Sequence, residues 1–335
     1  MTVADERIST FLARAAAAGA REAGAGAVRR VTALTGGTYN GLYAVELDGG
    51  ERLVLKVPPP FGRPRLTYER ELLYGEALFH RSAVGAGVPA PRVVHAEPAE
   101  GPGREPYLLM THVDGVPWWD VAEGMAAAER DRLRTGLGAL VARLHAVTGP
   151  GFGYPAPGGI PRAPRWSAAF TAMTGAVLDD AERYGSWLPL PVPEVRARLA
   201  AAREVLDEVT VPALVHFDLW PGNVLLDGPE GERTISGIID GERMFWGDPL
   251  ADFASLSLFL GDAESDPAFL AGYRAAGGTA DLDGPAALRR IALYRCYLYL
   301  IMLTEAVPRG YDAEHTAWVR DFAAPRLEAA LASAG

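Results

Sequence analysis

Short apolar runs separated by turn-forming residues fill the first third of the chain, and this pattern predicts β-strands. We expect strands at 31–34, 42–47, 53–57, 92–96 and 107–110. The Ala-rich segment 5–28 carries spaced apolar residues and predicts a surface helix that packs on the first sheet. Segment 67–83 has helical character, and the proline-containing segment 88–91 ends it.

Helical periodicity dominates the rest of the chain. Segment 126–147 has apolar residues at 3/4 spacing and predicts an amphipathic helix. Further helices are expected at 166–184, 194–208, 255–260, 266–276, 286–307 and 312–333. The Gly/Pro-rich segment 149–165 predicts a loop that serves as a lid or substrate rim. The pattern therefore indicates a β-rich first part and a mainly helical second part.

Polar residues that could take part in catalysis or metal binding gather in segment 214–226, LVHFDLWPGNVLL. Asp218 and Asn223 lie between two apolar runs, so we expect them in a loop that joins two strands. Asp240 ends the next apolar strand, and Asp252 follows a Gly-Asp-Pro turn from which it could anchor the loop. Two carboxylates and one amide carbonyl in this order can hold Mg²⁺ and orient a hydroxyl, as phosphoryl transfer requires.

Residues that could act together with this segment occur earlier in the chain. A glycine-bearing turn at 35–41 would let backbone N–H groups approach phosphates, although such a turn alone is weak evidence. Lys56 lies inside an apolar strand, and its position after the turn favours a phosphate contact over an edge-strand lysine. A helix carboxylate should pair with this lysine, with Glu76 as the first choice and Glu71 as the second.

Composition narrows the function classes. The 335 residues include 49% apolar and 22% charged residues, which fits a globular protein, and the net charge of −10 disfavours a nucleic-acid partner. Cys296 is the single cysteine, so we expect a buried thiol and no disulfide. The sequence shows no signal peptide and no apolar stretch near the roughly 20 residues of a membrane span, so we expect a cytoplasmic protein without a membrane partner.

Four segments together resemble the aminoglycoside phosphotransferase family of small-molecule kinases. They are Gly36–Asn40, Lys56, Met110–Gly115 and HFDLWPGN joined to IIDGERMFWGDPLADF. The resemblance implies an α+β, protein-kinase-like fold with a β-rich N-lobe at 1–110, a hinge at 111–117 and a mainly helical C-lobe at 118–335. It places the catalytic loop at 214–226, the metal segment at 236–253 and the nucleotide in the cleft between the lobes.

The resemblance also implies an ATP- or GTP-dependent O-phosphotransferase that uses Mg²⁺. Asp218 would be the catalytic base, and Asn223 and Asp240 would hold the metal. The nucleotide would contact Gly37, Thr38, Tyr39, Asn40, Lys56, Glu76, Met110, Thr111 and Val113. Three positions depart from the usual family pattern: Phe217 replaces Gly, Trp220 replaces His, and Gly241 replaces Trp.

The acceptor and the oligomeric state stay open at this point. Candidates are an aminoglycoside or another antibiotic, as in antibiotic resistance, or a metabolite such as choline, fructosamine, homoserine or a sugar. The acid-rich stretches at 179–182 and 262–266 could meet a polycation, although a solvated surface explains each of them better. Trp118, Trp119, Trp166, Trp187 and Trp246 could line an apolar or sugar-stacking pocket, although core packing explains most of them. A non-catalytic pseudokinase is the alternative, whereas a protein kinase is disfavoured because H-R-D, D-F-G and A-P-E motifs are missing.

Overall fold

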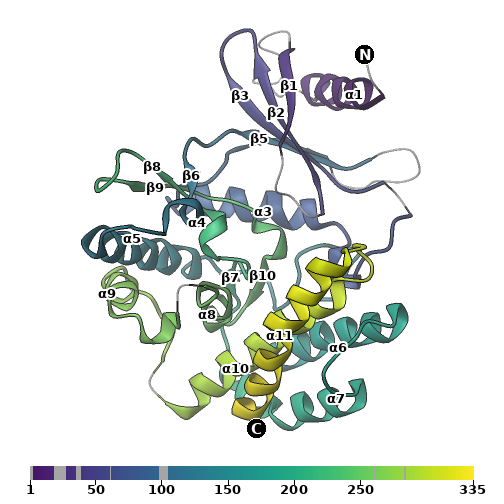
Figure 1. The fold of residues 1–335 in the computed structure, drawn as a ribbon, viewed down its shortest axis with the longest axis vertical. Helices are drawn as coiled ribbons and strands as arrows, with labels where there is room; N and C mark the ends of the chain where they lie inside the picture. Colours follow the sequence, from purple (N-terminus) through teal and green to yellow (C-terminus); the bar gives the residue numbers. More distant parts are fainter. Residues whose placement is uncertain are drawn as a thin grey trace.

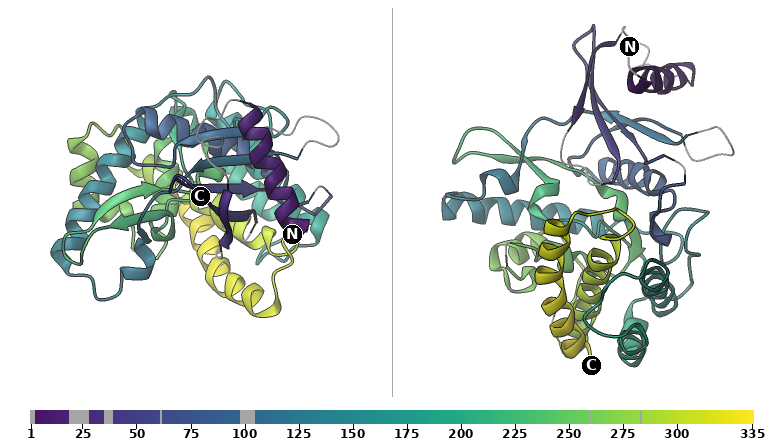
Figure 2. Two further views of the ribbon diagram at one scale, coloured as in Figure 1. Left: turned by 90° about the horizontal axis from the view of Figure 1, so that it is seen from above. Right: turned by 45° about the vertical axis from the view of Figure 1, so that its right-hand side comes forward.

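A computed structural model describes residues 3–18, 28–34, 39–60, 62–97, 105–259, 261–282 and 284–335. An antiparallel sheet forms the upper part of the molecule and helices form the lower part (Figure 1). The right-hand view of Figure 2, turned by 45° about the vertical axis, shows the same division. The predicted α+β, protein-kinase-like architecture is confirmed.

The upper sheet has the strand order β1-β2-β3-β5-β4. Its strands are β1 (Val28–Leu34), β2 (Gly41–Leu47), β3 (Arg52–Val57), β4 (Val93–Glu97) and β5 (Tyr107–Thr111). Helix α1 (Val3–Ala17) buries Ile8, Phe11 and Leu12 against one face of this sheet. Helix α3 (Leu72–Gly85) packs Leu73 and Ala77 against Leu108 and Met110. These two residues alternate along β5 with the ones that pack with α1, so the two helices cover opposite faces of the sheet.

The lower part holds eight α-helices of the described chain, several short 3-10 helices and two small sheets. The helices are α4 (Trp118–Val121), α5 (Ala127–His145), α6 (Trp166–Tyr184), α7 (Val192–Ala201), α8 (Asp252–Leu256), α9 (Pro267–Ala275), α10 (Pro285–Glu305) and α11 (Ala313–Ala334), with a short 3-10 helix at Arg203–Glu208. The sheets are β6 (Val116–Pro117), β8 (Val224–Asp227) and β9 (Thr234–Ile238) in the order β6-β8-β9, and β7 (Ala213–Val215) paired with β10 (Phe245–Gly247). These short strands carry both ends of the candidate catalytic loop.

Four predicted helices are shorter or broken. The helix expected at 194–208 ends as α7 at Ala201 and is followed by a 3-10 helix at Arg203–Glu208. The helix expected at 5–28 ends at Ala17, before glycines that disfavour helix, and Val28 already belongs to β1. The helix expected at 67–83 is a 3-10 turn and then α3, because Glu71 has a left-handed φ of 60° that a right-handed helix cannot include. Helix α8 ends at Leu256, and Phe259 has a left-handed φ of 69°. The prediction of a helix at 255–260 was therefore wrong beyond Leu256.

The main core lies among the lower helices. Cys296 is fully buried in α10, as predicted, and burial raises the pKa of its thiol far above the usual range. His145 is also buried, with Nδ1 2.9 Å from the Tyr273 hydroxyl and Nε2 3.0 Å from Asp252 Oδ2, so it is a packed histidine. No helix in the described ranges combines the length and apolarity needed to cross a bilayer.

Helices α5 and α9 approach each other at two glycines. A Cβ added at Gly138 would lie 2.1 Å from the carbonyl oxygen of Phe269, and one at Gly272 would lie 1.9 Å from the carbonyl oxygen of Thr135. These contacts are with backbone atoms, which cannot rotate away as a side chain could. The close crossing therefore depends on the absence of side chains at both positions.

Gly138→Ala and Gly272→Ala should each lower the free energy of unfolding by about 1–3 kcal/mol or more, because the helices must separate. Gly136→Ala is the matched control on α5, since its Cβ would meet only Ile235 Cδ1 at 3.9 Å. That control should be neutral or stabilising by up to about 1 kcal/mol, as alanine favours helix over glycine. Urea denaturation followed by circular dichroism measures all three, and equal effects at 136 and 138 would contradict the packing argument.

Candidate active site

Lys56 is the centre of the candidate site, and strand alternation directs its side chain. On β3, Leu53, Leu55 and Val57 face α1, so the side chain of Lys56 points to the opposite face, toward α3. Its Nζ atom lies 2.8 Å from Glu76 Oε2, so the ion pair predicted between these residues is present. The runner-up, Glu71, instead accepts a hydrogen bond from the backbone N–H of Gly158 at 3.0 Å.

Two carboxylates of the lower part complete the surroundings of Lys56. Nζ lies 2.5 Å from Asp240 Oδ1 and 2.8 Å from Glu242 Oε2. The oxygens of Glu76, Asp240 and Glu242 lie within 4.8 Å of one another, a spacing that suits a metal, but they surround the ammonium group of Lys56. This arrangement ties the sheet, helix α3 and the segment after β9 together.

The charged groups in this cluster shift one another's pKa values. Burial alone would lower the pKa of Lys56, but Asp240, Glu242 and Glu76 together hold it well above its usual value. Burial would raise the pKa of Asp240, yet the attraction of Lys56 outweighs burial and lowers it. Burial, with repulsion from Asp240 and Glu76, raises the pKa of Glu242 to about 7 despite Lys56. The ammonium and Asp240 are thus charged near neutral pH.

Hydrogen bonds to backbone groups hold the loop around Asp218 in place. Asp218 N–H donates to His216 Nδ1 at 3.1 Å, and the Asn223 amide donates through Nδ2 to the Asp218 carbonyl at 2.7 Å. The His216 Nε2 atom lies 3.0 Å from the carbonyl oxygen of Ile239, and Ile239 N–H donates to Asn223. These bonds bring Asp218 and Asn223 alongside the segment that carries Asp240, as the sequence predicted.

Asp252 holds the same loop from below. Its carboxylate accepts the backbone N–H of His216 at 3.2 Å and that of Phe217 at 2.7 Å. Its side chain is fully buried and also contacts His145 Nε2 at 3.0 Å. Ser255, one turn later, accepts the N–H of Leu219 at 2.9 Å. The anchoring role predicted for Asp252 is therefore confirmed.

Asn223 and Asp240 suit a magnesium ion by the chemistry of their donors. The Nδ2 atom of Asn223 is occupied by the Asp218 carbonyl, which leaves Oδ1 as the ligating atom of the amide. Asp240 uses Oδ1 for Lys56, while its side chain stays 38% exposed. Mg²⁺ prefers oxygen ligands and commonly takes only one or two from a protein. The residues present therefore fit such an ion.

The segment after β5 offers part of the predicted adenine contact. Thr111 N–H already donates to the carbonyl of Arg92 at 2.9 Å, so this N–H is not available to a nucleotide. No backbone hydrogen bond of Val113 is formed with another described residue. Met110 is buried with Leu73. The predicted backbone donor at this edge is thus Val113 rather than Thr111.

The glycine-bearing turn is described only in part. Gly37 and Thr38 lie outside the described residues. Asn40 donates through Nδ2 to Glu242 Oε2 at 2.7 Å, and the Tyr39 ring lies 5.1 Å from the guanidinium carbon of Arg309. Both residues therefore contact the lower part of the molecule.

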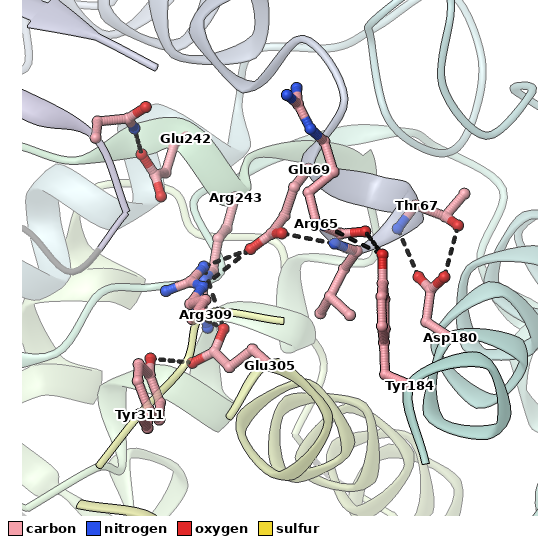
Figure 3. Close-up of polar contacts among 12 residues, drawn as sticks. Arg65, Thr67, Glu69, Asp180, Tyr184, Glu242, Arg243, Glu305, Arg309 and Tyr311 are labelled. Carbon is pink, nitrogen blue, oxygen red and sulfur yellow. Dashed lines mark hydrogen bonds and ion pairs between the residues drawn. The ribbon is translucent and has the colours of Figure 1, made fainter. Parts of the chain in front are cut away.

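A second group of charges also joins the two parts (Figure 3). Arg309, after α10, pairs with Glu69 at 2.6 Å and with Glu305 at 3.2 Å. Glu305 in turn pairs with Arg243 at 3.0 Å. Burial raises the pKa of Asp218, and the positive charge of Arg243 opposes that rise. This network thus connects the first part of the chain electrostatically to Asp218.

Sequence patterns alone missed Glu242 and Arg243. Both lie in the segment GERM directly after Asp240, and their proximity to a predicted metal ligand was the available signal. Gly241, between Asp240 and Glu242, is explained by packing, because a Cβ there would lie 2.2 Å from the Phe79 ring of α3. A larger residue at this position would push α3 and the metal segment apart.

Comparison with known proteins agrees with this geometry. The family described as "Phosphotransferase enzyme family" matches residues 30–291, and the chain belongs to this family of small-molecule kinases. It is 26% identical over 282 residues to viomycin phosphotransferase of Streptomyces vinaceus, covering 78% of this chain and 89% of that protein. It is also 28% identical over 244 residues to acyl-CoA dehydrogenase family member 11 of Rattus norvegicus, covering 70% of this chain.

The chain spans only 28% of the length of the rat protein. Among solved structures, the GDP complex of a mutant aminoglycoside 2'-phosphotransferase-IIIa superposes with a TM-score of 0.60 at 20% sequence identity. The alignment covers 92% of this chain and 95% of that chain. At this identity the likeness establishes the shared fold.

Phe217 stands where glycine is usual, and its backbone conformation is one that favours glycine. Its φ is 61°, in the left-handed region that glycine adopts freely and other residues at a cost of about 1–2 kcal/mol. Its ring is fully buried, with centroids 5.0 Å from Phe245 and 5.4 Å from Tyr297. Truncating such a ring typically costs about 3–5 kcal/mol, so its burial outweighs the strain.

Phe217→Ala should therefore destabilise the fold by about 3–5 kcal/mol. Phe217→Gly removes the same ring but also the backbone strain, so it should be less destabilising than the alanine variant by about 0.5–1 kcal/mol. Chemical denaturation of both variants measures the difference. Alanine proving more stable than glycine would show that the left-handed backbone is not maintained.

Proposed function

We propose that this protein transfers the γ-phosphoryl group of ATP or GTP to a hydroxyl of a small molecule. The observation that carries the proposal is the grouping of Lys56, Asp218, Asn223 and Asp240 around one region, on elements from both parts of the chain. Positioning and charge stabilisation dominate phosphoryl transfer, and this set supplies both. Membership of the phosphotransferase family supports the same reaction.

In this mechanism Asp218 orients the acceptor hydroxyl and takes its proton. The acceptor oxygen forms a bond to the γ-phosphorus while the bond to the bridging oxygen breaks, so a nucleoside diphosphate leaves with that electron pair. Lys56, held by Glu76, is directed to contact phosphate oxygens. Asn223 and Asp240 would hold Mg²⁺, which would offset the negative charge of the phosphates. The Val113 N–H would contact the base.

Asp218→Asn tests the catalytic base. We expect ADP or GDP formation in the presence of acceptor to fall by about 10²–10⁴-fold, because asparagine cannot accept the proton. Calorimetric affinity for the nucleotide should change little, since Asp218 acts on the acceptor. Asp240→Asn is the comparison variant and should weaken Mg²⁺-dependent nucleotide binding itself. Near-normal transfer by Asp218→Asn would exclude the proposed role, and absence of transfer by the parent protein with any hydroxyl acceptor would favour a pseudokinase.

The pH profile gives a second test. Burial raises the pKa of Asp218, so the carboxyl becomes protonated at a higher pH than an ordinary aspartate. A protonated carboxyl cannot act as a base, so kcat/KM should fall about tenfold per unit as pH decreases below this raised pKa. The midpoint should lie above the ordinary value of about 3.9. The residual activity of Asp218→Asn should lack this acidic limb, and an identical limb in that variant would assign it to another group.

A further inference from the structure

The structure offers a specific surface next to the candidate base. Trp220 lies two residues after Asp218, and its indole ring covers Gly222, where an added Cβ would lie 2.2 Å from the ring. The ring is thus folded over the loop between Asp218 and Asn223. The Trp220 residue is partly exposed.

Other aromatic rings continue this surface. Trp119 of α4 has its ring centroid 6.1 Å from Trp220 and 5.1 Å from Phe259, and Phe259 lies 5.8 Å from Trp220. Phe322 of α11 stacks on Phe259 at 5.2 Å, and Trp318 stacks on Phe322 at 5.4 Å. We call these five residues the aromatic wall. Helices α4 and α11, which supply its two ends, are labelled in Figure 1.

The wall is exposed in a way that simple core packing does not explain. Trp119 is 47% exposed, Phe259 41% and Trp318 46%. Phe259 also has a left-handed φ of 69°, which is unfavourable for a bulky residue and is found mainly where function maintains it. A contiguous set of exposed rings beside a catalytic loop typically marks a binding surface.

The charges nearby argue against a polycationic acceptor. Asp262 and Glu264, from one acid-rich stretch, both pair with Arg295 at 2.7 Å, and Asp266 pairs with Arg134 at 2.6 Å. In the other stretch, Asp179 pairs with Arg196, and buried Asp180 accepts the N–H and hydroxyl of Thr67. These five acids of the two stretches are therefore paired within the protein.

A positive charge also lies at the far end of the wall. The Arg326 guanidinium carbon is 3.9 Å from the Phe322 ring centroid. A cationic acceptor would be repelled at this end of the surface, whereas a neutral ring would gain stacking area.

We propose that the acceptor is a neutral molecule with a flat, apolar or aromatic ring system bearing the reactive hydroxyl, and that the aromatic wall selects it by stacking. This inference rests on the proposed phosphotransferase function. Trp119, Trp220 and Phe259 are then the specificity-determining residues next to Asp218. The acceptor ring lies on the wall and directs its hydroxyl toward the Asp218 carboxylate.

The test uses the full-length protein with three acceptors: 2-naphthaleneethanol as the ring probe, kanamycin as the polycation and choline as a small cation. Calorimetry measures the Kd of each without turnover, and ADP release measures transfer. We expect 2-naphthaleneethanol to bind most tightly of the three. Trp119→Ala and Phe259→Ala should each raise its Kd and KM by about 3–10-fold, with smaller changes in kcat.

Trp187→Ala is the matched control, because Trp187 is 44% exposed and stacks with Arg320 away from the wall. It should leave the Kd of the ring probe unchanged. Tighter binding of kanamycin or choline than of the ring probe would overturn the proposal, as would wall variants that alter oligomeric state but not the Kd. Loss of transfer with every acceptor would instead count against the phosphotransferase function, while the Kd values still decide the role of the wall.

Discussion

The ammonium group of Lys56 and its three carboxylates are the interaction on which the rest of the site depends. A buried charge is tolerated only when it is paired, and here Glu76 comes from α3 while Asp240 and Glu242 come from the segment after β9. The sheet, the helix beside it and the lower part of the molecule must therefore approach one another at one point. Asn40 adds to this junction through Glu242, so the turn before β2 is held by the same carboxylate.

The loop of Asp218 depends on a different kind of support. Its N–H groups are not paired within a regular strand or helix, and Asp252 and Ser255 of α8 accept them instead. This support allows Phe217 to keep a left-handed backbone and Trp220 to fold over Gly222. Rigid positioning of a catalytic loop by buried side chains is what a reaction governed by orientation requires.

The sequence predicted the strands, most helices, the Lys56–Glu76 pair and the anchoring by Asp252, because each follows from local periodicity or motif spacing. It did not predict the break at Glu71, since the contacts of this segment, from Thr67 to Asp180, from Glu69 to Arg309 and from Glu71 to Gly158, are with distant parts of the chain. Glu242 was missed because nothing local shows that its side chain turns toward Lys56. The aromatic wall joins residues 119, 220, 259 and 322, which only the folded chain brings together.

Arg309 has a consequence for how the end of α10 is held. Its guanidinium is almost completely buried and bridges Glu69 and Glu305, with the Tyr39 ring against it. Separating Arg309 from Glu69 would leave a buried charge without its partner, which typically costs several kcal/mol. The segment before α3 is therefore fixed to the end of α10 by one side chain. A substitution in this C-terminal region would act on the N-terminal part of the chain through a residue more than 200 positions away.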